Sequence, residues 1–329
     1  MPLRLGIALG SGAARGWAHI GVLRALEEMG VRPRVMCGTS VGAVVGAAYL
    51  TEQLDELRAW GQKMNLLGFL KMADLTFSRG GLVAVEKAFE LFRNASTDIE
   101  IQMLPGTFGV VATDLATGRE VWLREGPMLD VIRASAAMPG LFPAVKIGDQ
   151  WLVDGALVNP VPVSLCRALG ASAVIAVNLN SELSVLPQYA APSDPVVPTD
   201  PAEEPEPLAP PAPHLDHAPN SPLARFVDKI TATMDGGKKF LTSLRERPPT
   251  PGVLEIVAGS LDIMQDRITR ARLAGDPPEV LIAPKVGHIG ILDFDRADEL
   301  IEIGYAATLA QSEKILKVAG RQSALPLTG

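Results

Sequence analysis

The sequence is poor in the residues on which several classes of protein depend. Its 329 residues include two cysteines, four histidines and 5% aromatics. Two cysteines, at positions 37 and 166, make neither a disulfide framework nor a zinc cluster, so a reducing compartment is the simpler interpretation. The formal net charge of -7 comes without any run of Lys or Arg, and phosphate neutralisation needs clustered cations. We therefore expect no nucleic acid among the partners of this chain.

Long uninterrupted apolar runs are also missing. The longest apolar region, Val35–Leu50, is broken by glycines and falls short of the roughly 20 residues that span a bilayer. Leu5–Leu9 is shorter than a signal-peptide core of roughly 7–15 residues and is better interpreted as a buried strand. With 47% hydrophobic residues the chain can still bury a large core. We expect a cytoplasmic protein whose contact with a membrane is peripheral, at its inner face.

Proline and negative charge gather in one stretch. Ser184–Pro222 holds 12 of the 27 prolines and six of the 37 acidic residues, and it has no Lys or Arg. The rest of the chain, with 31 acidic and 30 basic residues, is nearly neutral. Burial of so few apolar side chains does not offset the ordering entropy, so we predict a mobile loop rich in polyproline II. A docking site for a proline-binding partner is the alternative.

Before this loop, short β-like runs alternate with helical patterns, which is typical of a parallel sheet covered by helices, and after it come helices and one more strand. The predicted strands are Leu3–Leu9, Pro33–Gly38, Thr107–Thr113, Glu120–Leu123, Ala144–Ile147, Trp151–Val153, Ala173–Leu179 and Val280–Ala283. The predicted helices are Trp17–Met29, Val41–Leu50, Glu52–Met64, Leu82–Phe92, Met128–Ala137, Val161–Leu169, Leu223–Leu244, Val253–Ala274 and a last one from about Arg296, with Asp295 as its N-cap. The fold class that follows is α/β.

A serine stands in the pattern Gly38-Thr39-Ser40-Val41-Gly42, after a predicted strand and before a predicted helix. This is the G-x-S-x-G elbow in the context that it requires, because flanking glycines allow a sharp turn that lifts the hydroxyl above a helix N-terminus. The helix dipole and free N–H groups favour negative charge there. Ser40 is therefore a candidate nucleophile, and a purely structural tight turn is the alternative.

A second glycine-rich turn, Gly10-Ser11-Gly12-Ala13-Ala14-Arg15-Gly16, also lies between a predicted strand and a predicted helix. Its consecutive N–H groups can cradle a phosphate or an oxyanion. A dinucleotide-binding site fits poorly, because the spacing is G-x-G-x-x-x-G and no acidic residue ends the next strand.

The third candidate is Asp154-Gly155-Ala156, which follows the apolar run Trp151–Val153. An Asp before a Gly is a common turn, but Ser40 needs a base. His214 and His217 lie in the proline-rich loop, and His19 lies on the first predicted helix, where it packs or faces solvent. His288 alone is left to complete a Ser–Asp–His order, as in an α/β-hydrolase.

In these three blocks the sequence resembles the patatin-like phospholipases, and within them the bacterial proteins related to the catalytic domain of neuropathy target esterase. The glycine-rich block, the elbow and the Asp-Gly-Ala block match in order and spacing over about Leu3–Leu179. The resemblance implies a three-layer α/β/α sandwich with a mostly parallel central sheet. Because the predicted strand Val280–Ala283 can rejoin the sheet, we expect one domain that the loop interrupts: a core at 1–183, the loop at 184–222, and a helical part at 223–329 that completes the same domain.

The resemblance also implies a Ser–Asp dyad, with Ser40 as nucleophile and Asp154 as the base, and an oxyanion hole in the glycine-rich block. Many relatives have three successive glycines where this chain has Ser11-Gly12-Ala13, and an alanine fits there if its φ is negative. Arg15 would hold the turn or bind an anionic headgroup. The expected substrate is a lipid or another acyl ester, with no cofactor and no metal; a homo-oligomer is compatible with the sequence.

Two segments have the composition of a contact with a membrane surface. Met64–Met72 could enter an interface or cover the acyl site, although a buried helix is the simpler interpretation. Phe226–Phe240 mixes basic and apolar residues at helical spacing. A non-catalytic membrane adaptor that keeps the fold therefore stays open as an alternative to an enzyme.

The position of the charged loop outside the three blocks gives a first prediction. Deleting Ser184–Pro222 should leave the turnover of a short p-nitrophenyl ester largely intact, because none of the matched blocks includes it. The kcat/KM of the deletion variant against that of the full chain tests this. A loss comparable with that of Ser40→Ala would show that the loop belongs to the site.

Overall fold

The computed structural model describes residues 4–63, 93–94, 97–139, 142–182 and 253–320. The backbone contacts divide the chain into one compact unit made of Met1–Ser184 and Leu254–Gly329 and a second made of Val185–Val253. The β-sheet of the protein lies in the first unit. The proline-rich loop and the segments Leu82–Phe92, Met64–Met72 and Leu223–Leu244 lie outside the described residues, and so do His214 and His217.

A single eight-stranded sheet organises this unit, in the order β5-β6-β3-β2-β1-β7-β8, with β4 paired to β3. The strands are β1 (Leu5–Leu9), β2 (Val35–Thr39), β3 (Thr107–Asp114), β4 (Glu120–Leu123), β5 (Val145–Ile147), β6 (Gln150–Asp154), β7 (Ala173–Val177) and β8 (Val280–Ile282). The strands β3, β2, β1, β7 and β8 run parallel, whereas β4, β5 and β6 pair antiparallel. The central strands β1, β2 and β7 are buried throughout, as expected for strands covered on both faces.

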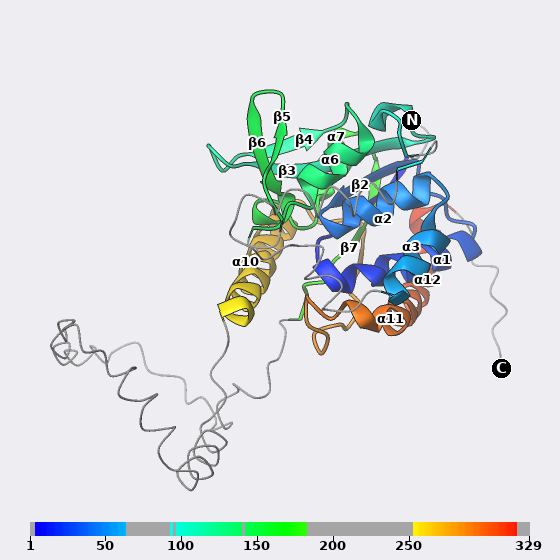
Figure 1. Ribbon diagram of the computed structural model, residues 1–329. Coiled ribbons are helices and arrows are strands. Elements are labelled where there is room, and N and C mark those ends of the chain that lie inside the picture. The colour runs from blue at the N-terminus through cyan, green and yellow to red at the C-terminus, as the bar shows by residue number, and fades with distance from the viewer. Residues whose placement is uncertain (1–3, 64–92, 95–96, 140–141, 183–252, 321–329) are drawn as a thin grey trace, which may run out of the picture. The chain divides into compact units, whose positions relative to one another are not determined.

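Helices cover both faces of the sheet, so the unit has three layers, α/β/α (Figure 1). The helices are α1 (Ala18–Glu28), α2 (Val41–Leu50), α3 (Leu54–Lys63), α6 (Met128–Ser135), α7 (Val163–Ala168), α10 (Val253–Gly275), α11 (Ala297–Leu309) and α12 (Ser312–Val318). Short 3-10 turns are η1 (Ala13–Trp17), η2 (Ile101–Met103), η3 (Gly155–Leu157) and η5 (Phe294–Arg296).

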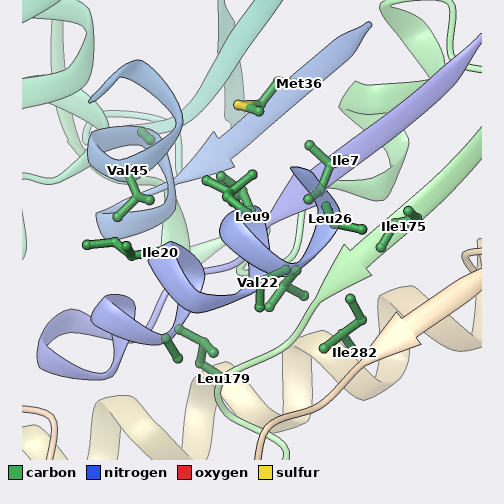
Figure 2. Packing of buried hydrophobic residues seen from close by; sticks show 14 of the residues in the cluster. Ile7, Leu9, Ile20, Val22, Leu26, Met36, Val45, Ile175, Leu179 and Ile282 are labelled. Carbon is green, nitrogen blue, oxygen red and sulfur yellow. The ribbon is translucent and has the colours of Figure 1, made fainter. Parts of the chain in front are cut away.

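The strands direct alternate side chains to two cores. Ile7 and Leu9 of β1 join the larger core with α1, α2 and α11, and Figure 2 shows Ile7 near Leu26 of α1 and Leu9 on the side of Ile20 and Val45. On the other face Ala8 of β1 packs with Cys166 of α7 in the second core. Both cysteines are buried and free, so they act as small apolar residues, as the sequence indicated.

Most predicted elements are confirmed to within two or three residues at each end, and Val41–Leu50 and Glu120–Leu123 have the predicted bounds. The N-cap prediction at the C-terminal helix is wrong. Asp295 lies inside η5, and α11 is capped by Arg296 with no side-chain hydrogen bond. The chain enters α11 through a 3-10 turn, whose backbone bonds replace the capping side chain.

Helices α1 and α11 approach each other at two glycines. A Cβ at Gly21 would overlap the carbonyl oxygen of Ile301, and one at Gly304 would overlap that of Ala18. Gly21→Ala should therefore lower the free energy of unfolding by about 1–3 kcal/mol, because added volume at a tight contact forces backbone shifts. Urea denaturation measures the effect.

Gly259 of α10 supplies the matched control. Apart from the backbone of the helix itself, no atom of the described residues lies within 4 Å of a Cβ at this position, so Gly259→Ala should be neutral or stabilising. Equal stability of the Gly21→Ala and Gly259→Ala proteins would contradict the close packing of α1 on α11.

Candidate functional site

The candidate nucleophile lies in a sharp turn between β2 and α2. Ser40 has φ 57° and ψ -124°, a conformation that residues other than glycine rarely adopt. Gly42 permits the turn, because a Cβ there would overlap the carbonyl oxygen of Leu9 at the end of β1. The elbow therefore rests directly on the start of the glycine-rich turn. Ser40 is 4% exposed and lies at the N-terminus of α2.

Strand β3 brings Asp154 close to Ser40, because it pairs with the strands that precede both residues. Thr39, the last residue of β2, pairs with Val111 of β3, and Asp154, the last residue of β6, pairs with Ala112. The two strands thus end at adjacent positions of β3 although they run in opposite directions. Residues that are 114 positions apart in the sequence meet there.

The Ser40 hydroxyl donates a hydrogen bond to Oδ2 of Asp154 over 2.6 Å. The other carboxylate oxygen, Oδ1, accepts the N–H of Ala156 over 2.8 Å. Burial raises the pKa of Asp154 from 3.8 to about 6, against the two hydrogen bonds from Ser40 and Ala156, which lower it. The structure thus brings together a strained serine and a carboxylate whose proton affinity is raised by desolvation.

Ser135 of α6 contributes a contact that the sequence analysis missed. Its hydroxyl accepts the backbone N–H of Ser40 over 3.0 Å and donates to the carbonyl oxygen of Val111 over 2.7 Å. This buried side chain ties the elbow to β3. No motif marks Ser135, because it lies on an ordinary amphipathic helix and acts through the backbone.

The glycine-rich turn follows β1 directly beside the elbow. The N–H groups of Ser11 and Ala14 are bonded to the carbonyl oxygens of Pro160 and Ile291, whereas those of Gly12 and Ala13 have no partner among the described residues. Ala13 has φ 47°, so the negative φ expected for an alanine at this position is not found. The left-handed conformation costs about 1–2 kcal/mol there. Tertiary contacts must supply that energy.

Those contacts come from the C-terminal part of the chain. The Arg15 guanidinium is fully buried, and it pairs with both oxygens of Asp262 over 3.0 and 3.1 Å. It also donates to the carbonyl oxygen of Ile289. Ser11 donates to Gln265 over 2.6 Å. Of the two roles expected for Arg15, the structure supports holding the turn in place.

A signal for these contacts is present in the sequence, outside the three motifs. Asp262, Gln265, Asp266 and Thr269 recur at helical spacing in a helix that also carries exposed apolar residues. All four are buried. Polar residues on the inner face of a helix indicate buried polar partners, here the turn at Ser11 and Arg15.

The two described histidines lie apart from the hydrogen bond between Ser40 and Asp154. His19 is buried, its Nε2 lies 2.7 Å from the carbonyl oxygen of Gly10, and burial lowers its pKa to about 4. It is therefore neutral near pH 7 and supports the glycine-rich turn. His288 is exposed, and its ring contacts Glu299 over 3.1 Å. The structure gives no support for a triad that uses His288.

Within the part of the chain that the structure describes, no three His, Cys, Asp or Glu residues are grouped so that they could hold a metal ion. In the same residues, no helix combines the length and the apolar character that crossing a membrane requires.

The comparisons with known proteins identify a family. A family model for patatin-like phospholipase matches residues 7–167, which include the glycine-rich turn, Ser40 and Asp154. An uncharacterized NTE family protein of Mycobacterium tuberculosis is 33% identical over 92% of this chain and 89% of its own length. The chain belongs to the patatin-like phospholipase family, among its NTE family proteins. This assigns it to the lipid hydrolases.

Other relatives are much longer than the part that matches. Lysophospholipase NTE1 of Pyricularia oryzae is 26% identical over 94% of this chain but over 18% of its own length. Neuropathy target esterase sws of Drosophila melanogaster is 30% identical over 54% of this chain and 13% of its own length. Among solved structures, VipD from Legionella pneumophila is similar over 46% of this chain and 45% of its own, at 14% identity and a TM-score of 0.28.

The raised pKa of Asp154 predicts how stability depends on pH. Between pH 3.8 and about 6 the folded chain holds a proton on Asp154 that the unfolded chain releases, so the free energy of unfolding falls as pH rises. Asp154→Asn cannot titrate, and its stability should lack this decline. Relative to Asp154→Asn, wild type should lose roughly 2–3 kcal/mol between pH 4 and 7.

Urea denaturation of both proteins over that range measures the difference, in which the titration of every other group cancels. Above about pH 7 the difference should be constant. A difference that does not change with pH, or that changes in the opposite direction, would show that Asp154 has no raised pKa.

Proposed function

We propose that this chain is a serine lipid acyl hydrolase with Ser40 as the nucleophile and Asp154 as the base. The observation that carries the proposal is the hydrogen bond of 2.6 Å from the Ser40 hydroxyl to Asp154 Oδ2. A serine is a weak nucleophile unless a base accepts its proton, and Asp154 is already within bonding distance. The positive φ of Ser40 adds support, because strain of this kind gathers at functional turns.

In the first half of the reaction, Oγ of Ser40 attacks the ester carbonyl carbon while its proton passes to Asp154. The electron pair of the C=O bond moves to the oxygen, and the tetrahedral oxyanion accepts hydrogen bonds from the backbone N–H groups of Gly12 and Ala13. These two donors are not engaged elsewhere among the described residues. Asp154 then protonates the departing alcohol, which leaves an acyl group on Ser40.

In the second half, Asp154 takes a proton from water, and the resulting hydroxide attacks the acyl carbon. The tetrahedral intermediate collapses with release of the fatty acid, and the proton on Asp154 returns to Oγ of Ser40. One carboxylate therefore serves as base and then as acid in each half. A pKa near 6 suits both duties close to neutral pH, whereas a carboxylate of ordinary pKa holds its proton too weakly.

The substrate class we infer is a phospholipid, a lysophospholipid or another carboxylic ester. The patatin-like phospholipase family supports the lipid, and the lysophospholipase and esterase among the relatives support cleavage of an acyl ester. Peripheral contact with a membrane follows from such a substrate. No described observation favours the adaptor function over the enzyme.

Substitution of the two residues tests the dyad. Ser40→Ala should abolish covalent labelling by a fluorophosphonate probe together with turnover. Asp154→Asn should lower kcat about 10²–10⁴-fold, the usual contribution of a general base. In wild type, kcat/KM should rise with pH through about 6 and then level off, because the base must be ionised. Probe labelling measures the first effect, and assays on p-nitrophenyl esters and on phospholipid measure turnover and its pH dependence.

His288→Ala is the matched control, since His288 is exposed and bonded to Glu299. It should keep wild-type turnover. Turnover that survives Asp154→Asn would rule out the dyad, and a folded but inactive His288→Ala protein would restore the triad.

A further inference from the structure

Helix α10 has its polar side buried and its apolar side exposed. From position 256 onward, its residues that are at most 5% exposed are all polar or charged: Asp262, Gln265, Asp266 and Thr269. Large apolar side chains on the same helix are 41–52% exposed: Ile256, Val257, Ile263 and Met264. A surface helix of a globular protein normally shows the reverse arrangement.

Contacts with the glycine-rich turn fix the rotation of α10 about its axis. Asp262 pairs with the buried Arg15, and Gln265 accepts hydrogen bonds from Ser11 over 2.6 Å and from Asn180 over 2.9 Å. Turning the apolar side inward would leave Arg15 buried without this carboxylate. The ion pair of Arg15 and Asp262 therefore keeps the apolar residues of α10 exposed.

The exposed apolar residues form one stripe, which we call the outer face of α10. Ile256, Val257, Ile263 and Met264 are spaced i, i+1, i+7 and i+8, so they lie on one side of the helix. Arg267 and Arg270 continue that side toward the C-terminus, and both are exposed.

Charge on the outer face has one sign. Between positions 256 and 275 the exposed residues include these two arginines and no acidic residue. Arg270 pairs with Asp266, which is buried, whereas Arg267 has no ion pair with a described residue. Apolar and basic residues on one side of a helix are typical of segments that lie in the surface of a bilayer.

We propose that the outer face of α10 docks on a lipid bilayer that carries anionic headgroups. Apolar side chains would enter the headgroup region while Arg267 meets the headgroup charge. The inference rests on the proposed function insofar as lipid is the substrate. Docking there would hold the bilayer about one helix diameter, roughly 10 Å, from the glycine-rich turn.

A second copy of this chain fits the outer face less well. In a two-fold pair the same patch meets itself, so the arginines of both copies would enter one interface to which the outer face brings no exposed acidic residue. Anionic lipid supplies the missing charge. Charge complementarity therefore selects the bilayer as the occupant.

Co-sedimentation with vesicles tests the proposal in a full-length chain that carries Ser40→Ala, so that turnover does not alter the lipid. Vesicles of phosphatidylcholine are compared with vesicles that also contain phosphatidylglycerol. Adding Ile263→Asp and Met264→Asp should weaken partitioning at least about tenfold, and Ile263→Leu with Met264→Leu should restore it. Arg267→Gln should lower partitioning about fivefold on anionic vesicles and leave it unchanged on phosphatidylcholine vesicles. High salt should abolish the difference between Arg267→Gln and the parent chain.

Met103→Asp is the matched control, because Met103 is 72% exposed and lies in η2 rather than on α10. It should partition as the parent chain does. Thermal denaturation of each variant verifies folding.

A fluorescent label reports the contact without any disruptive substitution. Both native cysteines are buried, so an environment-sensitive fluorophore can be attached selectively at Ile263→Cys, with Met103→Cys as control. On anionic vesicles, emission should rise several-fold at position 263 and stay unchanged at position 103.

Three results would overturn the proposal: no binding to anionic vesicles, binding that the two aspartates leave unchanged, or a dimer in solution that the two aspartates dissociate. Failure of the proposed function is a separate observation. A chain with native Ser40 that binds vesicles through position 263 but hydrolyses no ester would refute the enzyme and leave the docking surface in place.

Discussion

Desolvation of the Asp154 carboxylate is the constraint on which the rest of the site depends. Strands β2 and β6 end at neighbouring positions of β3, and this places Asp154 against Ser40 where neither residue is more than 4% exposed. Burial raises the pKa of the carboxyl, and the Ser40 hydroxyl with the Ala156 N–H limits the rise. The same burial that destabilises the charged form in the fold gives the carboxylate an affinity for the serine proton. In the proposed mechanism, the burial of Asp154 therefore lowers the stability of the fold and makes this carboxylate a better base.

The second requirement is a glycine-rich turn held in an unfavourable conformation. Ala13 has a positive φ, and its neighbours Ser11 and Arg15 are bound by residues that lie some 250 positions later in the chain. Breaking a buried ion pair such as that of Arg15 and Asp262 typically costs 3–5 kcal/mol, which exceeds the strain of one left-handed alanine. Helix α10 and the segment around Ile289 therefore complete the site that the N-terminal blocks begin. This also explains why α10 turns its polar residues inward and leaves apolar ones outside.

The sequence alone predicted the α/β class, most of the strands and helices, and the three blocks, because glycine spacing and apolar periodicity are local properties. It could not predict the pairing of β6 with β3, since strand order depends on contacts between distant segments. The role of Ser135 was hidden because its contact is with a backbone N–H. The conformation of Ala13 was not foreseen, because the contacts that impose it come from α10. The prediction of Asp295 as an N-cap is wrong because a 3-10 turn precedes α11, and composition does not distinguish such a turn from the start of an α-helix.

The titration of Asp154 itself tests the central claim most directly. The ¹³Cγ chemical shift of Asp154, followed by NMR and assigned with Asp154→Asn, should titrate with a midpoint of about 6. In Ser40→Ala the midpoint should lie higher still, because the hydroxyl no longer donates to the carboxylate. A midpoint near 3.8 that Ser40→Ala does not move would contradict both the desolvated carboxylate and its hydrogen bond to Ser40.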